Sequence, residues 1–519
     1  MNKTIKQVVV NVFSLWLSVV VQGVLAFLLI PFLIGVMGKD GYGVVGLLGV
    51  MVGMSAIADM GLRGALGREL AEQVVRRDIA RFNELITTAL ALYVCVACVL
   101  ALACWLMAPW LTSFFHVPAQ LQGRMVLLTR LYCGVSLFFS FATPVFNAAL
   151  GSYQRFDLIN GMETFRNILS SCCLFLMLPA MSDTIYGWAG IMLLSQLMLL
   201  ALVVYWTWRV CPGVSIRARH FCPARLPALF RLGGYMYALQ LTRMLSIQSD
   251  PLIISRFFGP GGVALYKPGQ QISGTLQGIV NAFANQLYPL TTKQHVDQQT
   301  LKMQRLLVSG TKYTLLLGVA AVVAMFVGAE PLCRLWMFSS LGADYKVVAA
   351  VLMGWAASDF MAYSSGTQWP VLLGMKKLKV LVWTQLPTAV LNVLVSIYLV
   401  GFTKLGIPGV LVATVIIGFV RRPIIIAYTA KLCGLSAWSY LREGYCRPFV
   451  VLFLLGGMAF GLRQSMVVDS WLALFVFFGC ILVIWMALAW SVGLDGEERG
   501  LFLKEVRSML SNKRRNVHG

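Results

Sequence analysis

Long apolar stretches follow one another along the chain from Val8 to Val492, and short polar connections separate them. About fourteen of these stretches are long enough to cross a hydrocarbon core of ~30 Å as an α-helix. Backbone groups in lipid must satisfy one another within the segment, which favours a helical bundle. The pattern therefore predicts an all-α integral membrane protein without a soluble domain. The predicted helices cover residues 8–37, 42–62, 84–109, 125–150, 164–182, 187–208, 232–257, 263–289, 306–329, 347–373, 380–401, 407–430, 448–463 and 471–492.

The starts of the two halves of the chain resemble each other. In each half a proline late in the first helix is followed by a glycine and then a tyrosine: Pro31, Gly38 and Tyr42, and Pro251, Gly259 and Tyr266. Coincidence among common membrane residues is one interpretation. The other is a duplicated six-helix unit, which in transporters places the substrate at the interface between the repeats.

Duplication predicts two pseudo-symmetric lobes and an additional helix pair. The predicted boundaries are an N-terminal lobe at 1–208, a basic linker at 209–231, a C-terminal lobe at 232–430, a helix pair at 431–492 and a basic tail at 493–519.

The charges indicate the orientation of the chain in the membrane. Only 12% of the 519 residues are charged, and the net charge is +22. Basic residues gather in alternate connections, within 63–81, 209–231, 293–305 and 376–379, and in the tail. This is the positive-inside pattern, so we expect both termini in the cytoplasm. The basic surplus then favours contact with anionic lipid headgroups and argues against nucleic acid as a partner.

The predicted helix 263–289 carries a polar stripe along nearly its full length. Its members recur every three or four residues and fall within a sector of ~80°. Hydrogen bonding at a buried helix seam is one interpretation. The wall of a wet cavity is the favoured one, because a full-length stripe that includes a lysine exceeds what helix association needs. The stripe consists of Lys267, Gln270, Gly274, Gln277, Asn281 and Asn285.

Two other helices contribute charges to the same hypothesis. Arg243 and Asp250 share one face of the helix 232–257, ~10 Å apart along its axis, which is too far for a direct ion pair. Arg243 and Asp250 therefore each need another partner. At the end of the helix 42–62, Asp59 and Arg63 are four residues apart and are expected to form a structural pair at the inner boundary.

Further charges lie within or near predicted helices. Arg421 and Arg422 follow the middle of the helix 407–430 and point ~100° apart, so one can reach the headgroups while the other faces protein. Asp359 is the other acid deep in a helix, and Asp250 and Asp359 could each carry a coupling ion, H⁺ or Na⁺, or neutralise an arginine. Lys312 is closer to a helix end and is expected at the interface.

The deep charges are mainly cationic, which suits a phosphate or diphosphate group better than an organic cation. The chain has no G-x-x-x-x-G-K-[ST] segment, so it carries no ATP-binding loop of that type, and we expect no cofactor. The spacing of Cys211, His220 and Cys222 fits no standard zinc site, so no metal is expected. No paired carboxylates stand at an outer helix end, which argues against an enzyme.

Four sequence segments, in this order and spacing, resemble the Wzx-type polysaccharide flippases of the multidrug/oligosaccharidyl-lipid/polysaccharide exporter superfamily. They are Gly38 with Tyr42-Gly43; Asp59-Met-Gly61-Leu62; Gln154-Arg155-Phe156-Asp157 with Asn160; and Asp250-Pro-Leu-Ile-Ile leading to Gly259 and Tyr266. The resemblance implies fourteen helices in two six-helix lobes plus a final pair, around a central cavity that opens alternately to each side.

The resemblance also implies a function in the bacterial inner membrane. The substrate would be an undecaprenyl-pyrophosphate-linked oligosaccharide, a repeat unit of O-antigen, capsule or exopolysaccharide, moved from the cytoplasmic to the periplasmic leaflet. A polysaccharide polymerase and a chain-length regulator would be protein partners. A peptidoglycan-precursor flippase and a drug/cation antiporter of the same superfamily are the alternatives, and the antiporter would need a dominant acidic site.

Overall fold

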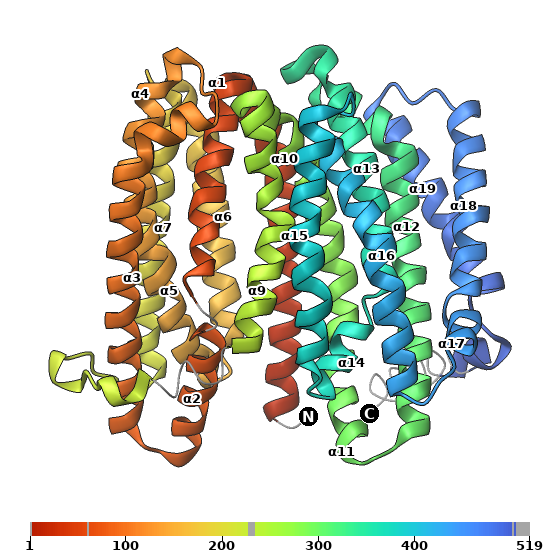
Figure 1. Ribbon diagram of the computed structural model, residues 1–519, viewed down its shortest axis with the longest axis horizontal. Helices are drawn as coiled ribbons and strands as arrows, with labels where there is room; N and C mark the ends of the chain where they lie inside the picture. The colour runs from red at the N-terminus through yellow and green to blue at the C-terminus, as the bar shows by residue number, and fades with distance from the viewer. Residues whose placement is uncertain (1–2, 60–61, 227–233, 501–502, 505–519) are drawn as a thin grey trace, which may run out of the picture. The chain divides into compact units, whose positions relative to one another are not determined.

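The computed structural model describes residues 3–59, 62–226, 234–500 and 503–504, and every regular element in these ranges is helical (Figure 1). Nine segments of these ranges are long and apolar enough to cross a membrane. They account for eleven of the fourteen predicted helices, because Ser14–Ile57 and Thr300–Gly374 each hold two. The prediction of an all-α, multipass membrane protein is confirmed.

The three predicted helices outside these nine segments are the most polar ones. They correspond to α6 (Phe156–Met177) and to α9 (Gly234–Ile247) with α10 (Ser249–Asn285). Charged side chains interrupt their apolar sequence, Arg166 in α6, Arg243 in α9 and Lys267 in α10. Because a charge inside a membrane helix is costly and usually functional, these helices are the first place to look for a site.

The chain forms two compact units. Unit 1 comprises the described residues of Met1–Ile279, Trp336–Val351 and Leu378–Ile417, and unit 2 those of Val280–Leu335, Leu352–Lys377 and Gly418–Gly519. Four helices pass from one unit into the other: α10, α12 (Thr300–Leu341), α13 (Tyr345–Ser364) and α16 (Gly409–Leu432). The predicted lobe boundaries stay a prediction.

Unit 1 holds most of the N-terminal helices. Its apolar core includes Leu66 of α2, Ile86 of α3 and Val145 of α5, all of which are buried. α2 was expected to be a loop; its buried leucines at 62, 66 and 70 recur every four residues and form one apolar helical face. The elements entirely within unit 1 are α1 (Lys3–Met54), α2 (Leu62–Arg76), α3 (Ile79–Phe114), α4 (Ala119–Leu128), α5 (Gly134–Ser152), α6, α7 (Thr184–Val210), α9 and α15 (Leu378–Phe402).

Two glycines fold long helices of unit 1 back on themselves. α1 contains both predicted helices 8–37 and 42–62, joined at Gly38 with φ 74° and ψ 168°. α10 contains the end of one predicted helix and the whole of the next, joined at Gly259 with φ 68° and ψ −177°. A positive φ is readily adopted only by glycine, so both turns depend on that residue. The two turns predicted from the sequence thus have nearly the same backbone conformation.

Unit 2 packs α12 against the last two long helices of the chain. Val319, Val451 and Phe477 are fully buried between them, and the Trp485 indole donates a hydrogen bond of 2.8 Å to the carbonyl oxygen of Leu316. Three short helices lie at the lower end of unit 2 in Figure 1. The elements entirely within unit 2 are α11 (Leu287–Val296), α14 (Gln368–Gly374), α17 (Ala437–Gly444), α18 (Cys446–Ser465) and α19 (Trp471–Leu488).

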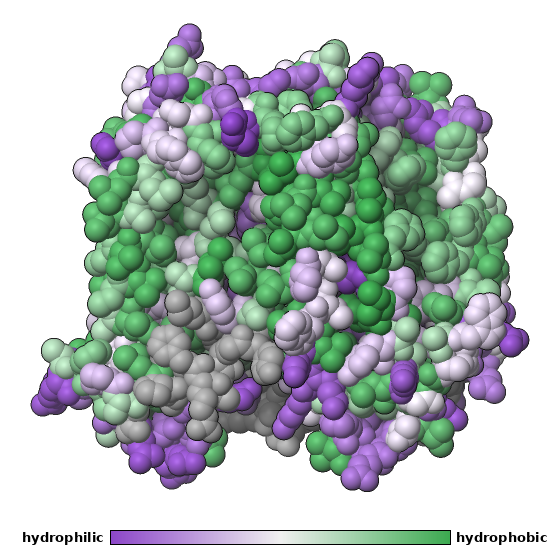
Figure 2. Space-filling view, in the orientation of Figure 1, coloured by the Kyte–Doolittle hydropathy of each residue, from purple (hydrophilic) through white to green (hydrophobic). Residues whose placement is uncertain are grey.

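Each unit carries exposed apolar side chains along its long helices. On the face shown in Figure 2, apolar residues cover the middle of each unit, while polar residues gather at its two ends. Val99 of α3 is 67% exposed, and Phe453 of α18 is 74% exposed. Such surfaces are stable against lipid acyl chains, as expected for a membrane protein.

Candidate functional site

A buried carboxylate lies at the start of α10. The predicted helix 232–257 is interrupted at Gln248, and Asp250 follows in the first turn of α10 with 1% of its surface exposed. The Tyr266 hydroxyl donates a hydrogen bond of 2.8 Å to Asp250 Oδ2. The kink at Gly259 turns the two parts of α10 toward each other and thereby brings Tyr266 to Asp250. Among the described residues, the buried Oδ1 of Asp250 has no hydrogen-bond partner.

The polar stripe predicted on α10 forms one accessible line on that helix. Lys267, Gln270 and Gln277 are half-buried and belong to unit 1, and Gly274 between them is exposed. The Lys267 ammonium donates a hydrogen bond of 3.1 Å to Gln270 Oε1. Within the described part of the chain, no carboxylate lies at ion-pair distance from Lys267. Its charge is therefore only partly compensated.

The last two members of the stripe fall in unit 2. Asn281 and Asn285 are both exposed, while Val280 and Ala284, their neighbours on α10, are buried. The amide side chains thus occupy the accessible face of the helix in this unit as well.

Arg243 of α9 has an exposed side chain. The described residues include no ion-pair partner for it, and Asp250 is not one, in agreement with the ~10 Å axial spacing. Arg243 and Lys267 are thus cations of unit 1 that are available to an external anion.

In unit 2, the guanidinium of Arg422, a residue of α16, lies at the end of α13, where a predicted helix is broken. The predicted helix 347–373 is interrupted after Ser364, and the Arg422 guanidinium donates a hydrogen bond of 3.3 Å to the carbonyl oxygen of Ala362 and another to Ser365 Oγ. A cation is favourable at the carbonyl end of a helix. Asp359, fully buried one turn earlier, interacts electrostatically with the same arginine. Arg422 therefore faces protein, whereas Arg421 beside it points in another direction.

Side chains of unit 2 stabilise this break. Gln368, the first residue of α14, donates hydrogen bonds of 2.6 Å to the Tyr440 hydroxyl and 3.0 Å to the Tyr445 hydroxyl. The Tyr445 hydroxyl donates one of 2.6 Å to the carbonyl oxygen of Ser364. The interruption is thus a built feature of the unit, with its freed backbone groups paired as the membrane interior requires.

Asp59 and Arg63 are neighbours, although not on one regular helix. α1 ends at Met54 and α2 begins at Leu62, so the expected continuous helix through both residues is wrong. Arg63 Nε nevertheless lies 3.4 Å from Asp59 Oδ1, and the buried Tyr93 hydroxyl donates a short hydrogen bond to the same carboxylate. Asp59 therefore has an ion-pair partner and a hydrogen-bond donor, in contrast to Asp250.

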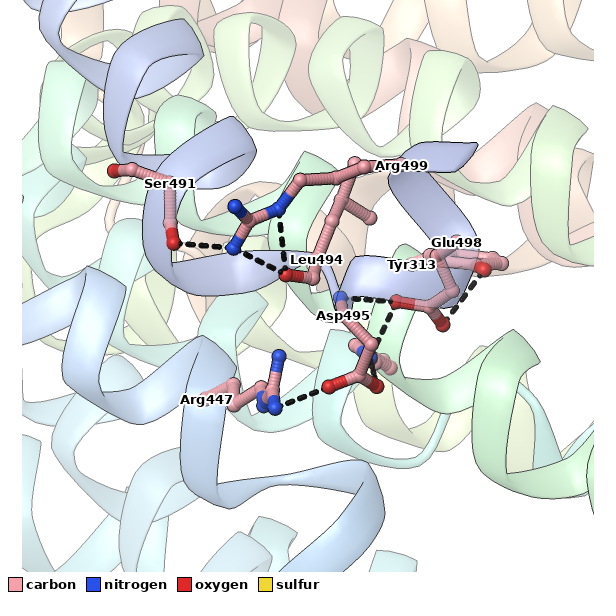
Figure 3. A network of polar contacts seen from close by, with 8 residues as sticks. Tyr313, Arg447, Ser491, Leu494, Asp495, Glu498 and Arg499 are labelled. Atoms are coloured by element: carbon pink, nitrogen blue, oxygen red, sulfur yellow. Dashed lines mark hydrogen bonds and ion pairs between the residues drawn. The ribbon is translucent and has the colours of Figure 1, made fainter. Parts of the chain in front are cut away.

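Lys312 of α12, in unit 2, has two carboxylate partners. Its side chain is 3% exposed, and its expected position at the membrane interface stays a prediction. Its ammonium lies 2.7 Å from Asp495 Oδ2 and 2.6 Å from Glu498 Oε2, and both carboxylates belong to the segment that follows α19 (Figure 3). Tyr313 donates a hydrogen bond of 2.8 Å to the other oxygen of Glu498, and Arg447 pairs with the other oxygen of Asp495.

The two carboxylates of this network remain ionised. The hydrogen bond from Lys312 is the largest influence on Asp495 and holds its pKa below the ordinary value. For Glu498, partial burial opposes ionisation, but the hydrogen bonds from Lys312, Tyr313 and the Asp495 backbone outweigh it and lower the pKa. Arg499 fixes the preceding turn through a hydrogen bond of 2.7 Å to the Ser491 carbonyl oxygen (Figure 3). We refer to Leu494–Arg499 as the C-terminal anchor.

A cavity of about 510 Å³ adjoins the C-terminal anchor. Four basic and four acidic side chains line it together with neutral residues, so it has no surplus of positive charge for an anionic headgroup. The charged residues are Arg305, Lys312, Arg442, Arg447, Glu443, Asp495, Glu497 and Glu498.

Sequence reasoning missed a charged pair in α6 of unit 1. Glu163 and Arg166 are half-buried, three residues apart, and interact electrostatically. The signal was available, because opposite charges at i and i+3 share a helix face. It was overlooked because the predicted helix began at 164, which left Glu163 in a loop.

No group of three or more His, Cys, Asp or Glu side chains in the described ranges could hold a metal ion.

Comparisons with known proteins agree with this membrane architecture. A Bacillus subtilis (strain 168) protein named uncharacterized membrane protein EpsK is 20% identical over 92% of this chain and 94% of its own length. A Shigella flexneri protein, provisionally named an O-antigen transporter, is 22% identical over 49% of this chain and 59% of its own length. The inward closed structure of the lipid II flippase MurJ is similar with a TM-score of 0.69 at 14% identity, over 93% of this chain and 98% of that one.

The family model described as polysaccharide biosynthesis protein matches residues 8–295, more than half of the chain. The fold of the chain is similar to that of the MurJ structure. The chain belongs to the polysaccharide biosynthesis protein family.

Proposed function

We propose that this protein is a flippase that moves a polyprenyl-diphosphate-linked oligosaccharide, such as an undecaprenyl-linked repeat unit, from the cytoplasmic to the periplasmic leaflet. Membership in a polysaccharide biosynthesis family supports the glycan class of the substrate. Alternating access of a polar cavity would shelter the sugar, while the prenyl chain stays in lipid.

The proposal rests on two cations of unit 1, neither of which has an acidic partner among the described residues. Arg243 is exposed, and Lys267 has only an amide partner at 3.1 Å among the described residues. Lipid-facing cations without a counter-charge would be strongly unfavourable, whereas a diphosphate compensates them by charge-assisted hydrogen bonds. The amides of the α10 stripe supply both donors and acceptors beside these cations.

In this proposal Asp250 is the residue that binds the coupling ion. The positive charge of Arg422 compensates Asp359, so this carboxylate needs no further cation. Asp250 has one tyrosine hydrogen bond and a buried oxygen without a partner among the described residues, so binding H⁺ or Na⁺ would complete its surroundings. Ion binding at Asp250 would then drive the change of access.

The proposed orientation has both termini in the cytoplasm, as the distribution of basic residues favours. A polysaccharide polymerase and a chain-length regulator would act on the product in the periplasm.

The test is a comparison of lipid extracts from cells with and without the gene, with the linked glycan identified by mass spectrometry. We expect a lipid-linked oligosaccharide to accumulate without the gene, together with loss of a surface polysaccharide. Re-expression of an Arg243→Ala variant should leave the accumulation in place, although the protein is inserted at the normal level. A stable Arg243→Ala protein with normal export would remove this residue from the mechanism.

Two results would favour the alternatives. Accumulation of the peptidoglycan precursor would indicate a flippase for that lipid. An unchanged lipid-linked pool, combined with altered drug sensitivity, would favour the antiporter.

A further inference from the structure

The polar face of α6 is turned into unit 1. On the opposite face Phe165 is 52% and Leu176 79% exposed, whereas Ser170 and Ser171 are buried. Near the start of the helix, Asn160 donates a hydrogen bond of 3.0 Å to Ser14 of α1. The rings of Phe32 and Phe175 lie 4.6 Å apart near its end. The polar face of α6 therefore runs beside α1.

A group of polar side chains surrounds Arg166 on this face. Arg166 Nη2 donates a hydrogen bond of 2.7 Å to Asn167 Oδ1, and Glu163 lies one turn earlier. The Tyr132 hydroxyl, from the π-helical segment Thr129–Cys133 between α4 and α5, forms hydrogen bonds with Ser136 and Gln196 and interacts electrostatically with Arg166. We call this group the α6 cluster: Tyr132, Ser136, Glu163, Arg166, Asn167 and Gln196.

The α6 cluster leaves two hydrogen-bonding atoms unused. Arg166 Nε and Gln196 Oε1 are buried and have no partner among the described residues. Buried polar atoms without partners are uncommon in folded proteins, and each calls for a water, an ion or a ligand. Two of them in one place, from α6 and α7, indicate a site that is completed by something outside the chain.

The chemistry of the α6 cluster indicates which ligand completes it. An ionised phosphate can only accept hydrogen bonds, and the negative charge of the Glu163 carboxylate beside Arg166 would repel it. A sugar hydroxyl both donates and accepts, so it can bond to the carboxylate, the guanidinium and the amides together. Glu163, Arg166, Asn167 and Gln196 are half-buried and hence partly accessible.

We propose that the α6 cluster is a glycan-binding subsite that holds sugar hydroxyls of the transported lipid. This inference rests on the proposed function and adds a second contact region to it. The cations Arg243 and Lys267 would hold the diphosphate, while the α6 cluster would hold the sugar and thereby contribute to glycan selectivity.

The test separates sugar binding from diphosphate binding. The purified full-length protein in nanodiscs is titrated with undecaprenyl diphosphate and, separately, with the lipid-linked oligosaccharide extracted from cells that lack the gene. The variants are Glu163→Gln and Arg166→Ala, with Asn167→Ala as a substitution that keeps both charges. Phe165→Ala, on the exposed apolar face of α6, is the matched control.

We expect the α6 variants to bind the glycan-bearing lipid about tenfold more weakly, as loss of one charge-assisted hydrogen bond predicts, and to bind undecaprenyl diphosphate as the wild type does. The Phe165→Ala protein should bind both lipids normally. Unchanged binding of both lipids by all three variants would overturn the subsite. An equal loss for both lipids at an unchanged melting temperature would also overturn it, because the cluster would then act on the diphosphate. If the wild-type protein binds neither lipid, the proposed function itself fails.

Discussion

Lys312 and Lys267 are both lysines within long helices, yet their surroundings differ in kind. Lys312 in unit 2 lies between two carboxylates at 2.7 Å and 2.6 Å. Lys267 in unit 1 has an amide oxygen at 3.1 Å, and no described carboxylate lies at ion-pair distance. Both positions are costly for a charge, but only the first is compensated within the protein.

This difference separates structural charges from functional ones. A buried charge with its counter-charge in place stabilises the fold, and little is left for a ligand to compensate. A charge that the chain leaves partly uncompensated makes the empty protein less stable than it could be, and a ligand of opposite charge recovers that free energy. Asp59 and Asp250 show the same contrast between two acids, because Asp59 has Arg63 and Tyr93 as partners whereas Asp250 has Tyr266 alone among the described residues.

The largest expected effect comes from removing the C-terminal anchor. A chain ending at Gly493 lacks Asp495 and Glu498, which leaves Lys312 buried without a counter-charge and costs about 3–5 kcal/mol. We expect the truncated protein to be lost from membranes or to melt far earlier in detergent. A chain ending at Gly500 keeps the anchor and is the matched control. Addition of Lys312→Met to the shorter chain should restore much of the stability, and failure to do so would show that the ion pairs are not the cause.

Removing the charge of Lys267 should lower the affinity for the lipid and leave the stability of the protein intact. Lys267→Met is expected to leave the melting temperature unchanged or raised, since it removes a partly buried cation. The affinity for undecaprenyl diphosphate should fall about 10- to 100-fold, with Lys267→Arg close to the wild type. Titration and thermal unfolding of the same samples measure both quantities. Loss of stability without loss of binding would place Lys267 with Lys312 as a structural charge.

Asp250→Asn should uncouple transport from the ion gradient. The amide keeps the shape of the side chain but cannot bind a cation in exchange for its own charge. We expect transport in proteoliposomes to lose its dependence on an imposed H⁺ or Na⁺ gradient, a change of about 5- to 150-fold. The Asp359→Asn protein, measured in parallel, should keep its gradient dependence if it folds. Gradient-driven transport by Asp250→Asn would remove the coupling role from this carboxylate.

Acid should weaken the C-terminal anchor by a smaller amount, because Asp495 is 43% exposed and its interactions are partly screened. The pKa values of Asp495 and Glu498 are lower in the folded protein than in the unfolded chain. Their contribution is therefore present above the ordinary carboxyl pKa of about 4 and is lost as the pH falls through the lower folded values. Melting curves between neutral and acidic pH should show this loss in the wild type, and a flatter dependence in Asp495→Asn/Glu498→Gln.

The fold was largely predictable because it follows from local patterns. Apolar length identified the helices, and the glycines at 38 and 259 marked the two turns that the structure confirms as positive-φ positions. The α10 stripe was also predictable, since spacing by three or four residues fixes a helix face. The roles of the predicted site residues stay predictions.

Other features depend on contacts that spacing does not reveal. The partners of Lys312 lie 183 and 186 residues away along the chain, so its burial could not be inferred from α12 alone. The pairing of Arg422 with the end of α13 required knowledge of the break after Ser364. Arg166 was within reach of sequence reasoning, but the predicted helix start at 164, eight residues after the start of α6, left Glu163 outside the helix.

The C-terminal anchor also sets a constraint on synthesis. Lys312 is synthesised 183 residues before its partner Asp495. At a translation rate of about 5–20 residues per second, this interval lasts roughly 10–40 s. During this time the lysine must be accommodated by water, lipid headgroups or the insertion machinery, so α12 can take its final position only after Asp495 and Glu498 have been synthesised. A nascent chain that stops before Asp495 therefore carries a lysine without its two counter-charges.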